Sequence, residues 1–264
     1  MKQNRMAEIQ KILTDEKQVN NLELCQRLNI SLATLRRYLD RLEQEGLIRR
    51  VYGGAVLAGT SEGKENSPLR WDIRRCKNAG EKRSLAAEVI DLIPKNCTVF
   101  IDTSTSAFEV AKLLASRGHN TVLTNSLRAA AVLSTNETLQ VYCLGGYINP
   151  GRFSISGIMA AECLALAPDI DICILSPDGF SPSGGLREHS MESAILKRAV
   201  IQRSSTVIAL LDHSKFSTEA GVLLCPTQQV NTIVTSRKAP LQDLQRLQEM
   251  QRLQEMQIRT ITVS

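Results

Sequence analysis

Five short segments of the chain hold residue types that suit a small anionic ligand. Hydroxyl side chains and backbone amides at the start of a helix can bind a phosphate group. Carboxylates and amide side chains can bind sugar hydroxyls, and a lysine such as Lys197 or Lys215 can neutralise a phosphate. One such segment alone is typical of a helix cap, so the prediction depends on all of them together. The segments are Asp102–Ser106, Thr124–Ser126, Gly145–Gly146, Ser176–Gly179 with Gly184–Gly185, and Asp212–Phe216.

Each segment follows a short apolar run that is typical of a β-strand, and helical stretches separate these runs. Near-continuous apolar strands alternating with helices predict an α/β fold with a mostly parallel sheet covered on both faces. The expected strands are Thr98–Ile101, Thr121–Thr124, Gln140–Leu144, Ile172–Leu175, Thr206–Leu211, Thr232–Thr235 and Thr260–Val263. The expected helices are Glu81–Leu92, Ala107–Arg117, Leu127–Ser134, Ser190–Arg203 and Leu241–Met256.

Parallel strands place their carboxyl ends at one edge of the sheet, where open α/β sheets bind ligands. We therefore expect the polar segments to converge into one pocket although they are far apart in sequence. Lys215 is the favoured phosphate-binding lysine, because it directly follows a buried strand. The predicted ligand-binding residues are Asp102, Ser104, Thr105, Ser106, Thr124, Asn125, Gly145, Gly146, Asp178, Gly179, Glu192, Lys197, Asp212 and Lys215.

A second group of residues, near the start of the chain, suits DNA. Ser31 is a natural N-cap for a helix whose solvent face carries arginines, a threonine and a tyrosine. Arginines bind phosphates and guanine edges, while threonine and tyrosine contact phosphates or thymine methyl groups. A solvated helix face is the alternative, but a basic hairpin after the helix matches the wing of a winged helix. The predicted DNA-binding residues are Ser31, Thr34, Arg36, Arg37, Tyr38, Arg41, Arg49 and Arg50.

The chain divides into three parts by pattern and composition. Residues 1–57 read as three short helices and a hairpin, and two helices joined by about four residues make a helix-turn-helix. Asn20 with Glu23 resembles a capping box, and the third helix carries an inward leucine stripe before it stops at Gly46. Residues 58–80 have the composition of a linker, and residues 81–264 form the α/β domain. The stripe comprises Leu32, Leu35, Leu39 and Leu42.

Composition excludes several classes of protein. The 264 residues are 43% hydrophobic and 22% charged, as in ordinary globular proteins. Residues 1–57 hold ten Lys/Arg against seven Asp/Glu, so three of the five net positive charges lie there. No apolar run reaches the roughly 18 residues of a membrane span, and the polar start argues against a signal peptide. The seven scattered cysteines fit a reducing cytoplasm rather than a disulfide framework.

Other chemistry is not indicated. No cluster has metal-ligand spacing, and neither a Walker loop nor a G-x-G-x-x-G motif follows a strand, so we expect no metal and no cofactor. His119 is expected in solvent and His189 before a helix. A perfect duplication, QRLQEM, spans Gln245–Met256. Its copies point 120° apart on a helix, so Leu247 and Leu253 cannot share a core stripe. We interpret the duplication as a tolerated insertion that lengthens a surface helix, with a partner-binding helix as the alternative.

The order of these motifs resembles the DeoR family of bacterial transcriptional regulators along nearly the whole chain. The helix and wing read SLATLRRYLDRLEQEGLIRRVYGGAV, and EKRSLA, FIDTSTSAFEVAKLL, TVLTNS, LGG, SISG and LLDHSKF follow. The resemblance implies a winged helix-turn-helix joined to a sensor domain similar to the ribose-phosphate isomerase fold. It also implies a repressor of a sugar-catabolic operon that leaves its operator when a phosphorylated sugar binds. Members of the family are usually homo-oligomers, which implies a dimer or tetramer.

Two positions depart from the family pattern. The family usually has an acidic residue after the paired arginines, where this chain has Tyr38. The usual D-x-G-T-T loop has Ser104 in place of glycine, which would be a handicap if positive φ or close approach to a phosphate were required there.

Two other functions stay open at this point. The first is a sugar-phosphate isomerase or deaminase with an appended DNA-binding module, in which acidic residues and Lys215 perform acid–base chemistry. A recognition helix gives such an enzyme no obvious benefit, so we expect that the protein is not an enzyme. The second is a DNA-binding protein whose sensor has lost its ligand, which Ser104 keeps open.

Overall fold

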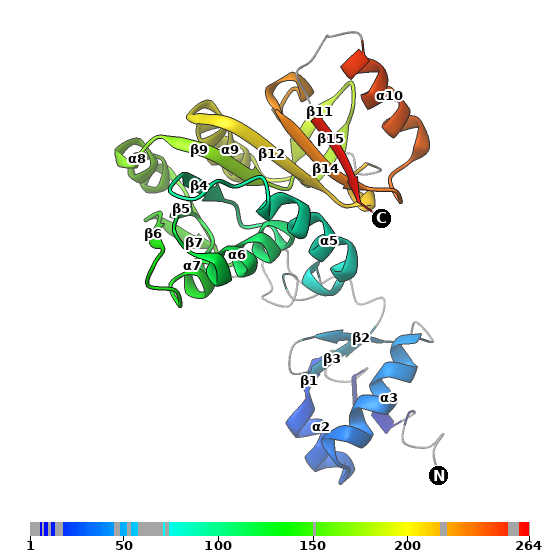
Figure 1. The fold of residues 1–264 in the computed structure, drawn as a ribbon. Helices are drawn as coiled ribbons and strands as arrows, with labels where there is room; N and C mark the ends of the chain where they lie inside the picture. The colour runs from blue at the N-terminus through cyan, green and yellow to red at the C-terminus, as the bar shows by residue number, and fades with distance from the viewer. Residues whose placement is uncertain are drawn as a thin grey trace. The chain divides into compact units, whose positions relative to one another are not determined.

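The computed structural model describes residues 6, 8, 9, 12, 13, 18–44, 48–51, 54–57, 71, 74–149, 152–216, 221–252 and 259–263. The chain forms two compact units, Met1–Lys77 and Asn78–Ser264 (Figure 1). We call them the N-terminal unit and the C-terminal unit. None of the helices in the described part of the chain combines the length and apolar character that a membrane crossing needs.

The N-terminal unit is a winged helix-turn-helix, as the sequence predicts. Its sheet has the order β1-β3-β2, in which β3 pairs antiparallel with both neighbours. The strand β1 was not expected, because three residues are too few to show alternation. The described elements are β1 (Gln18–Asn20), α2 (Asn21–Leu28), α3 (Leu32–Gln44), β2 (Ile48–Val51) and β3 (Gly54–Leu57).

A small apolar core holds this unit together. Leu35, Leu39 and Leu42 of α3 are buried against leucines of α2 and against Ile9 and other residues near the start of the chain. The prediction that Leu32 also points inward was wrong. Its side chain is 39% exposed, because it is the first residue of α3 and lies at the edge of the packed stripe. The predicted stop at Gly46 lies outside the described residues.

The C-terminal unit is built on a seven-stranded sheet with the order β15-β14-β12-β9-β4-β5-β6. Every neighbouring pair is parallel, so the predicted α/β fold is confirmed. The strands are β4 (Thr98–Ile101), β5 (Thr121–Thr124), β6 (Gln140–Cys143), β9 (Ile170–Leu175), β12 (Ser204–Leu211), β14 (Thr232–Ser236) and β15 (Arg259–Val263). The helices are α5 (Ala79–Ile90), α6 (Thr105–Arg117), α7 (Leu127–Leu133), α8 (Ile158–Leu166), α9 (Met191–Gln202) and α10 (Leu241–Arg252).

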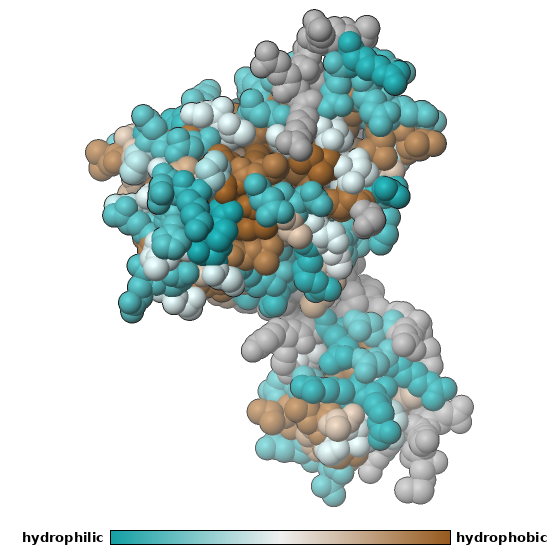
Figure 2. Space-filling view, in the orientation of Figure 1, coloured by the Kyte–Doolittle hydropathy of each residue, from teal (hydrophilic) through white to brown (hydrophobic). Residues whose placement is uncertain are grey.

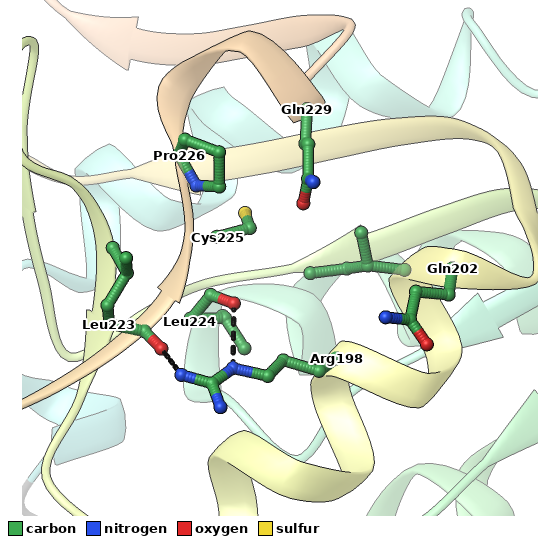
Figure 3. Close-up of a pocket in the computed structure, with 8 residues that line it drawn as sticks. Arg198, Gln202, Leu223, Leu224, Cys225, Pro226 and Gln229 are labelled. Atoms are coloured by element: carbon green, nitrogen blue, oxygen red, sulfur yellow. Dashed lines mark hydrogen bonds between the residues drawn. The ribbon is translucent and has the colours of Figure 1, made fainter.

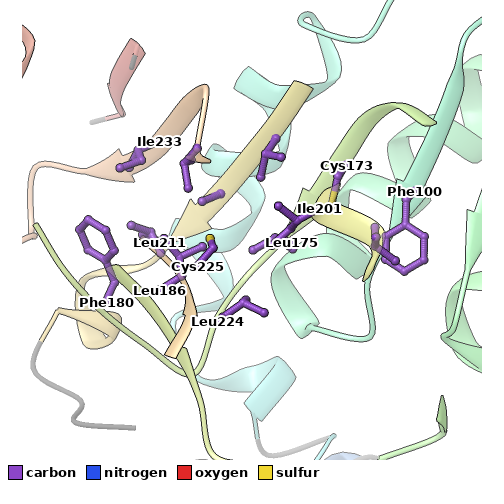
Figure 4. Close-up of a cluster of buried hydrophobic side chains, with 14 of the residues drawn as sticks. Phe100, Cys173, Leu175, Phe180, Leu186, Ile201, Leu211, Leu224, Cys225 and Ile233 are labelled. Atoms are coloured by element: carbon purple, nitrogen blue, oxygen red, sulfur yellow. The ribbon is translucent and has the colours of Figure 1, made fainter. Parts of the chain in front are cut away.

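Helices cover both faces of this sheet. The helices α5, α6 and α7 pack side by side, and α8 and α9 belong to the other layer (Figure 1). The core beneath α9 joins alternate residues of the central strands, among them Phe100, Cys173, Leu175 and Leu211, to Ile201 of the helix (Figure 4). Because side chains alternate along a strand, the intervening residues face α5 and α6. Leu247 and Met250 of α10 are buried, while Leu253 of the duplication lies outside the described residues.

Several small elements were not expected from the sequence. A hairpin of β7 (Tyr147–Asn149) and β8 (Ser154–Ser156) precedes α8. A second sheet has the order β10-β11-β13, from β10 (Gly179–Ser181), β11 (Gly185–Glu188) and β13 (Val222–Cys225). Two short 3₁₀ helices are η1 (His213–Lys215) and η2 (Thr227–Gln229).

Candidate functional site

The turn between α2 and α3 is fixed by local hydrogen bonds that the sequence encodes. Asn20 caps α2, accepting from the Glu23 N–H at 2.8 Å, and Asn29 ends the helix in the left-handed conformation with φ 48°. Ser31 starts α3, because its Oγ accepts from the Thr34 N–H at 3.2 Å. These caps set the angle at which α3 leaves the turn, and therefore which of its side chains face solvent.

The exposed face of α3 carries three of the eight predicted DNA-binding side chains. Arg36, Arg37 and Arg41 are exposed, opposite the buried leucines. Thr34 is half-buried and exchanges a 3.0 Å hydrogen bond with the Ser31 hydroxyl. Tyr38 is also half-buried and packs against the core, so it is less available than its place in the pattern suggested.

The wing is tied to α3 by charged groups. Arg50 on β2 forms an ion pair with Asp40 of α3, and its backbone N–H donates to the Glu43 carboxylate at 2.9 Å. The Arg49 side chain lies outside the described residues. The ion pair fixes the hairpin beside α3, so the predicted basic wing and the helix form one surface within this unit.

The second site lies where the chain stops adding strands on one side of β4 and begins to add them on the other side. From β4 the chain adds β5 and β6 on one side, then returns to add β9, β12 and β14 on the other. The switch point therefore falls between β4 and β9, the place where open α/β sheets bind ligands. Asp102 follows β4 there and accepts from the Ser176 N–H, just after β9, at 3.2 Å. Its own N–H donates to the Ile174 carbonyl at 3.1 Å.

Ser104 organises the start of α6 at this switch point. Its N–H and hydroxyl donate to Asp102 Oδ1 at 2.9 and 2.5 Å, and its Oγ accepts from the Ala107 N–H at 3.1 Å. Its φ is −68°, so the position needs no glycine for conformation. The predicted handicap of serine here, as far as it concerned positive φ, is therefore absent. Thr105 and Ser106 follow in the buried first turn of α6.

Lys197 of α9 lies in a buried network of opposite charges. Its Nζ is 2.9 Å from Asp102 Oδ2, also pairs with Glu188, and donates to the Ser176 carbonyl at 3.3 Å. Burial alone would lower the pKa of Lys197, but Asp102 and Glu188 raise it above the ordinary value. The ammonium therefore remains charged and neutralises the carboxylates at the switch point.

Sequence reasoning missed Glu188, although its position held a signal. It lies two residues after Leu186 on β11, and both side chains are buried on the same face of the strand. A carboxylate at a core-facing position requires a partner. Burial and the charge of Asp178 raise the pKa of Glu188 in spite of the attraction of Lys197.

Asp178 is held ionised at the same edge. Its Oδ2 accepts from the His189 N–H at 3.1 Å. Burial alone would raise the pKa of Asp178, but the charge of Lys197 and the His189 N–H hold it well below the usual value. The charges of Lys215 and Arg152 lower the same pKa further. The charges of three cations therefore favour the ionised form of Asp178, and of these sequence reasoning missed Arg152.

The turn after β12 presents Asp212 and Lys215. Asp212 is buried, and its Oδ1 accepts from the N–H and hydroxyl of Ser214 at 3.0 and 2.5 Å. Burial would raise the pKa of Asp212, but these hydrogen bonds and the charge of Lys215 lower it. Lys215 is half-buried and is the last residue of η1, in the turn that follows the carboxyl end of β12.

The polar groups after β5 differ in whether they are already hydrogen-bonded within the protein. The Thr124 hydroxyl donates to the Ile101 carbonyl at 2.7 Å and accepts from the Ser126 N–H at 3.0 Å, so it joins the strands. Asn125 donates to the Ile155 carbonyl at 3.2 Å, while its Oδ1 is buried without a hydrogen-bond partner among the described residues. The buried Ser176 hydroxyl has none there either. Such atoms are costly unless a ligand or water satisfies them.

The remaining predicted residues lie less centrally. Glu192 is exposed in the first turn of α9, and no ion pair joins it to the described residues of the network. Gly146 has φ 147°, and a Cβ there would lie 2.7 Å from the Ser156 carbonyl oxygen. Gly145 is exposed, while Gly179 is buried at the start of β10.

A cavity of about 240 Å³ lies elsewhere, between the end of α9, β13 and η2 (Figure 3). Gln202, at the end of α9, lies two residues before β12 begins, so this wall of the cavity is near the amino end of that strand. Arg198 at its wall donates to the Leu223 and Leu224 carbonyls. None of the predicted ligand-binding residues lines it.

Two family models match the chain. The DeoR-like helix-turn-helix domain matches residues 5–61, and the DeoR C terminal sensor domain matches residues 77–237. A D-ribose-5-phosphate isomerase solved with phospho-erythronic acid aligns with 51% of this chain and 52% of its own at a TM-score of 0.39 and 16% identity.

Three relatives match most of the chain. The transcriptional repressor AccR of Agrobacterium fabrum is 34% identical, covering 88% of this chain and 89% of its own. The glycerol-3-phosphate regulon repressor of Escherichia coli is 31% identical, covering 87% and 88%. The HTH-type transcriptional regulator GolR of Listeria innocua is 30% identical, covering 89% and 90%. With both of its units matched in order, the chain belongs to the DeoR family of transcriptional regulators.

Proposed function

We propose that this protein is a transcriptional repressor that binds double-stranded operator DNA through α3 and its wing and is released by a phosphorylated sugar. The observation that carries the proposal is that one chain combines a winged helix-turn-helix in its N-terminal unit with a charged network at the switch point of the sheet in its C-terminal unit. The relatives named above support repression, because two of them are named repressors. One of these names contains glycerol 3-phosphate, a small phosphorylated polyol.

The phosphate is assigned to the first turn of α6, with Lys215 as the neutralising cation. Backbone N–H groups at a helix start and its dipole both favour an anion. The buried Thr105 and Ser106 supply hydroxyls beside these amides, while the Ser104 hydroxyl donates to Asp102. Lys197 is a weaker candidate for direct contact, because two carboxylates already surround its ammonium.

The sugar hydroxyls are assigned to acceptors beside the phosphate site. The carboxylate of Asp178 stays ionised and accepts hydrogen bonds, and the unpaired Oδ1 of Asn125 lacks a donor among the described residues. A sugar hydroxyl would satisfy that acceptor. The Ser176 hydroxyl, which has no hydrogen-bond partner among the described residues, can donate or accept.

We also infer that the protein binds this ligand without converting it. The relatives named above support this inference, because all three are named as transcriptional regulators or repressors. A turnover assay with each sugar phosphate tests this directly, since product formation would favour the enzyme.

The experiment for the main proposal is a thermal-shift screen of the full chain. The panel contains ribose 5-phosphate, glucose 6-phosphate, fructose 1-phosphate and glycerol 3-phosphate, with the unphosphorylated compounds as matched controls. A true ligand at 100 times its Kd stabilises the folded chain by about 2.7 kcal/mol. An operator is selected from a random DNA pool. Failure of the whole panel to shift the Tm would contradict the assigned ligand class, and failure to enrich any DNA would contradict the assigned partner.

We propose further that the protein acts as a homo-oligomer on two operator half-sites. One winged helix buries too little surface for tight binding at physiological salt. An apolar surface supports self-association: Ile158, Met159 and Leu166 of α8 are 82%, 68% and 89% exposed, and apolar colour gathers at the α8 end of the C-terminal unit (Figure 2). Light scattering should give more than one chain per particle, and Leu166→Lys should lower that mass if α8 is the contact.

A further inference from the structure

The carboxylate of Glu81, in the first turn of α5, holds the turn that follows β12. Its Oε1 accepts from the His213 N–H at 2.8 Å and from the Ser236 hydroxyl at 2.5 Å. Its Oε2 lies 2.7 Å from His213 Nδ1. Only 3% of the Glu81 side chain is exposed, so these hydrogen bonds are shielded from water. One buried carboxylate therefore fixes both η1 and the end of β14 to α5.

Asn78 makes a second bond between the same two segments. It lies directly before α5 with φ 55°, and its amide Nδ2 donates to Asp212 Oδ1 at 3.0 Å. Asp212 also binds Ser214. Consecutive residues of the turn, Asp212 and His213, are thus both bonded to the start of α5. The same turn ends in Lys215, the cation assigned to the effector phosphate.

The start of α5 is also the start of the C-terminal unit. Asn78 is its first residue, and Lys77 is the last residue of the N-terminal unit. A displacement of the η1 turn can therefore be passed through hydrogen bonds to Glu81 and to Asn78, the residue that directly follows the N-terminal unit. Coupling between two sites requires such an element whose arrangement both sites bias.

We propose that Asn78 and Glu81 are positioning residues that couple effector binding at the Asp212–Lys215 turn to the chain entering the DNA-binding unit. The proposal rests on the proposed function, because it needs an effector at that turn and DNA at α3. Neither side chain needs to contact the ligand or the DNA. Their loss should uncouple the two binding events while each event persists.

The variants are Asn78→Gly and Glu81→Gln. Glycine removes the amide but tolerates the left-handed backbone, and glutamine keeps the shape of the side chain without its charge. Asn96→Gly is a matched control, because Asn96 has φ 60° but lies before β4 at the opposite end of the strands. Glu109→Gln is the second control, because Glu109 is another buried glutamate, paired with Lys112.

The measurement is the Kd of the full chain for its selected operator duplex, with and without a saturating amount of the panel compound that raises the Tm most. In the parent and in both controls, the compound should weaken operator binding by about 5- to 150-fold. In Asn78→Gly, Glu81→Gln and their double variant this factor should fall below about threefold. Operator affinity without the compound should stay within about threefold of the parent in all variants.

A direct readout is the fluorescence of Trp71, the chain's single tryptophan, seven residues before Asn78. Its emission should change when the compound binds the parent and the controls, and should not change in the double variant, although a Tm shift shows that the compound still binds. A parent-like release factor and a parent-like fluorescence change in the double variant would overturn the proposal. If no compound of the panel binds the parent, the proposed function and this inference both fail. If compounds bind the parent and release DNA from every variant, only the inference fails.

Discussion

Helix α3 and the carboxyl edge of the large sheet use charge in different surroundings. On α3, Arg36 and Arg37 are exposed to solvent. At the sheet edge, Asp102 is fully buried, and the Lys197 and Glu188 side chains are 6% and 2% exposed. An exposed arginine keeps its hydration until a phosphate replaces it, so it contributes to binding and little to folding. A buried charge needs its partners for the fold itself.

The two regions also suit different kinds of ligand. A long anionic surface such as DNA can be bound by arginines spread along one helix face, and the binding weakens with salt. A small ligand must be held by groups whose positions are already fixed. The hydrogen bonds of Ser104, Asp178 and Asp212 provide that fixation at the sheet edge.

The largest effect should come from removing the buried cation. Lys197→Met leaves Asp102 and Glu188 buried without their counter-charge, which costs about 3–5 kcal/mol of unfolding free energy. Urea denaturation followed by circular dichroism measures this loss. Arg37→Ala is the matched removal of an exposed cation, and it should change the unfolding free energy by no more than about 0.5 kcal/mol. If the two substitutions lowered the unfolding free energy equally, the buried charges of the sheet edge would stabilise the fold no more than the exposed charges of α3 do.

Next in size is the loss of effector binding in Lys215→Ala. Removing a charge-assisted hydrogen bond to phosphate costs about 1.5–3 kcal/mol, so roughly ten- to a hundredfold more sugar phosphate should be needed for release. Operator binding without effector should persist. Lys95→Ala is the control, because Lys95 is exposed before β4, at the other end of the strands. A parent-like effector response of Lys215→Ala would remove Lys215 from the site.

A comparable loss, confined to DNA, is expected from Arg37→Ala. Operator binding should weaken by about 1–3 kcal/mol if Arg37 contacts a base, with effector affinity unchanged. Fluorescence anisotropy on a labelled duplex measures the change, and Arg27→Ala on α2 serves as a control because Arg27 is paired with Glu23. Unchanged operator affinity in both Arg36→Ala and Arg37→Ala would eliminate α3 as the recognition helix.

The smallest effect concerns pH. The pKa of Asp212 is lowered in the folded chain, because hydrogen bonds and Lys215 outweigh burial. An ionised Asp212 therefore stabilises the fold above the unfolded pKa of about 3.9, and this contribution is lost as pH falls through the folded value. Asp212→Asn should cost about 1 kcal/mol at neutral pH, since the amide oxygen still accepts one hydrogen bond. Unfolding curves of the parent and of Asp212→Asn, measured at pH 7 and near pH 3, should lie closer together at the lower pH. A difference in unfolding free energy that is the same at both pH values would contradict the assigned cause.

The strands of the large sheet could be predicted because buried parallel strands are continuous apolar runs. The bounds expected for Thr98–Ile101 and Thr121–Thr124 are those found for β4 and β5. The helix α8 was missed because its sequence, IMAAECLAL, is apolar on nearly every side and has no helical period. The three-residue strands of the β7–β8 hairpin were too short to show alternation.

The site could be predicted only as far as topology determines it. Asp102, Asp178 and Lys197 are brought together because they follow or face neighbouring strand ends. Glu192 was predicted with them but is exposed on α9, because its helix position points away from the buried Lys197. Arg152 was missed because its approach to Asp178 depends on the β7–β8 hairpin, which the sequence pattern did not reveal. The roles of these residues in ligand binding stay predictions.

The most direct test of the account is the effect of a bound sugar phosphate on operator affinity in the unmodified full chain. A labelled operator duplex is titrated with protein, with and without a panel compound that raises the Tm, and with its unphosphorylated form as the control. The phosphorylated compound should weaken operator binding by about 5- to 150-fold, and the unphosphorylated control should leave it unchanged. A compound that binds the protein and leaves operator affinity unchanged would contradict this prediction.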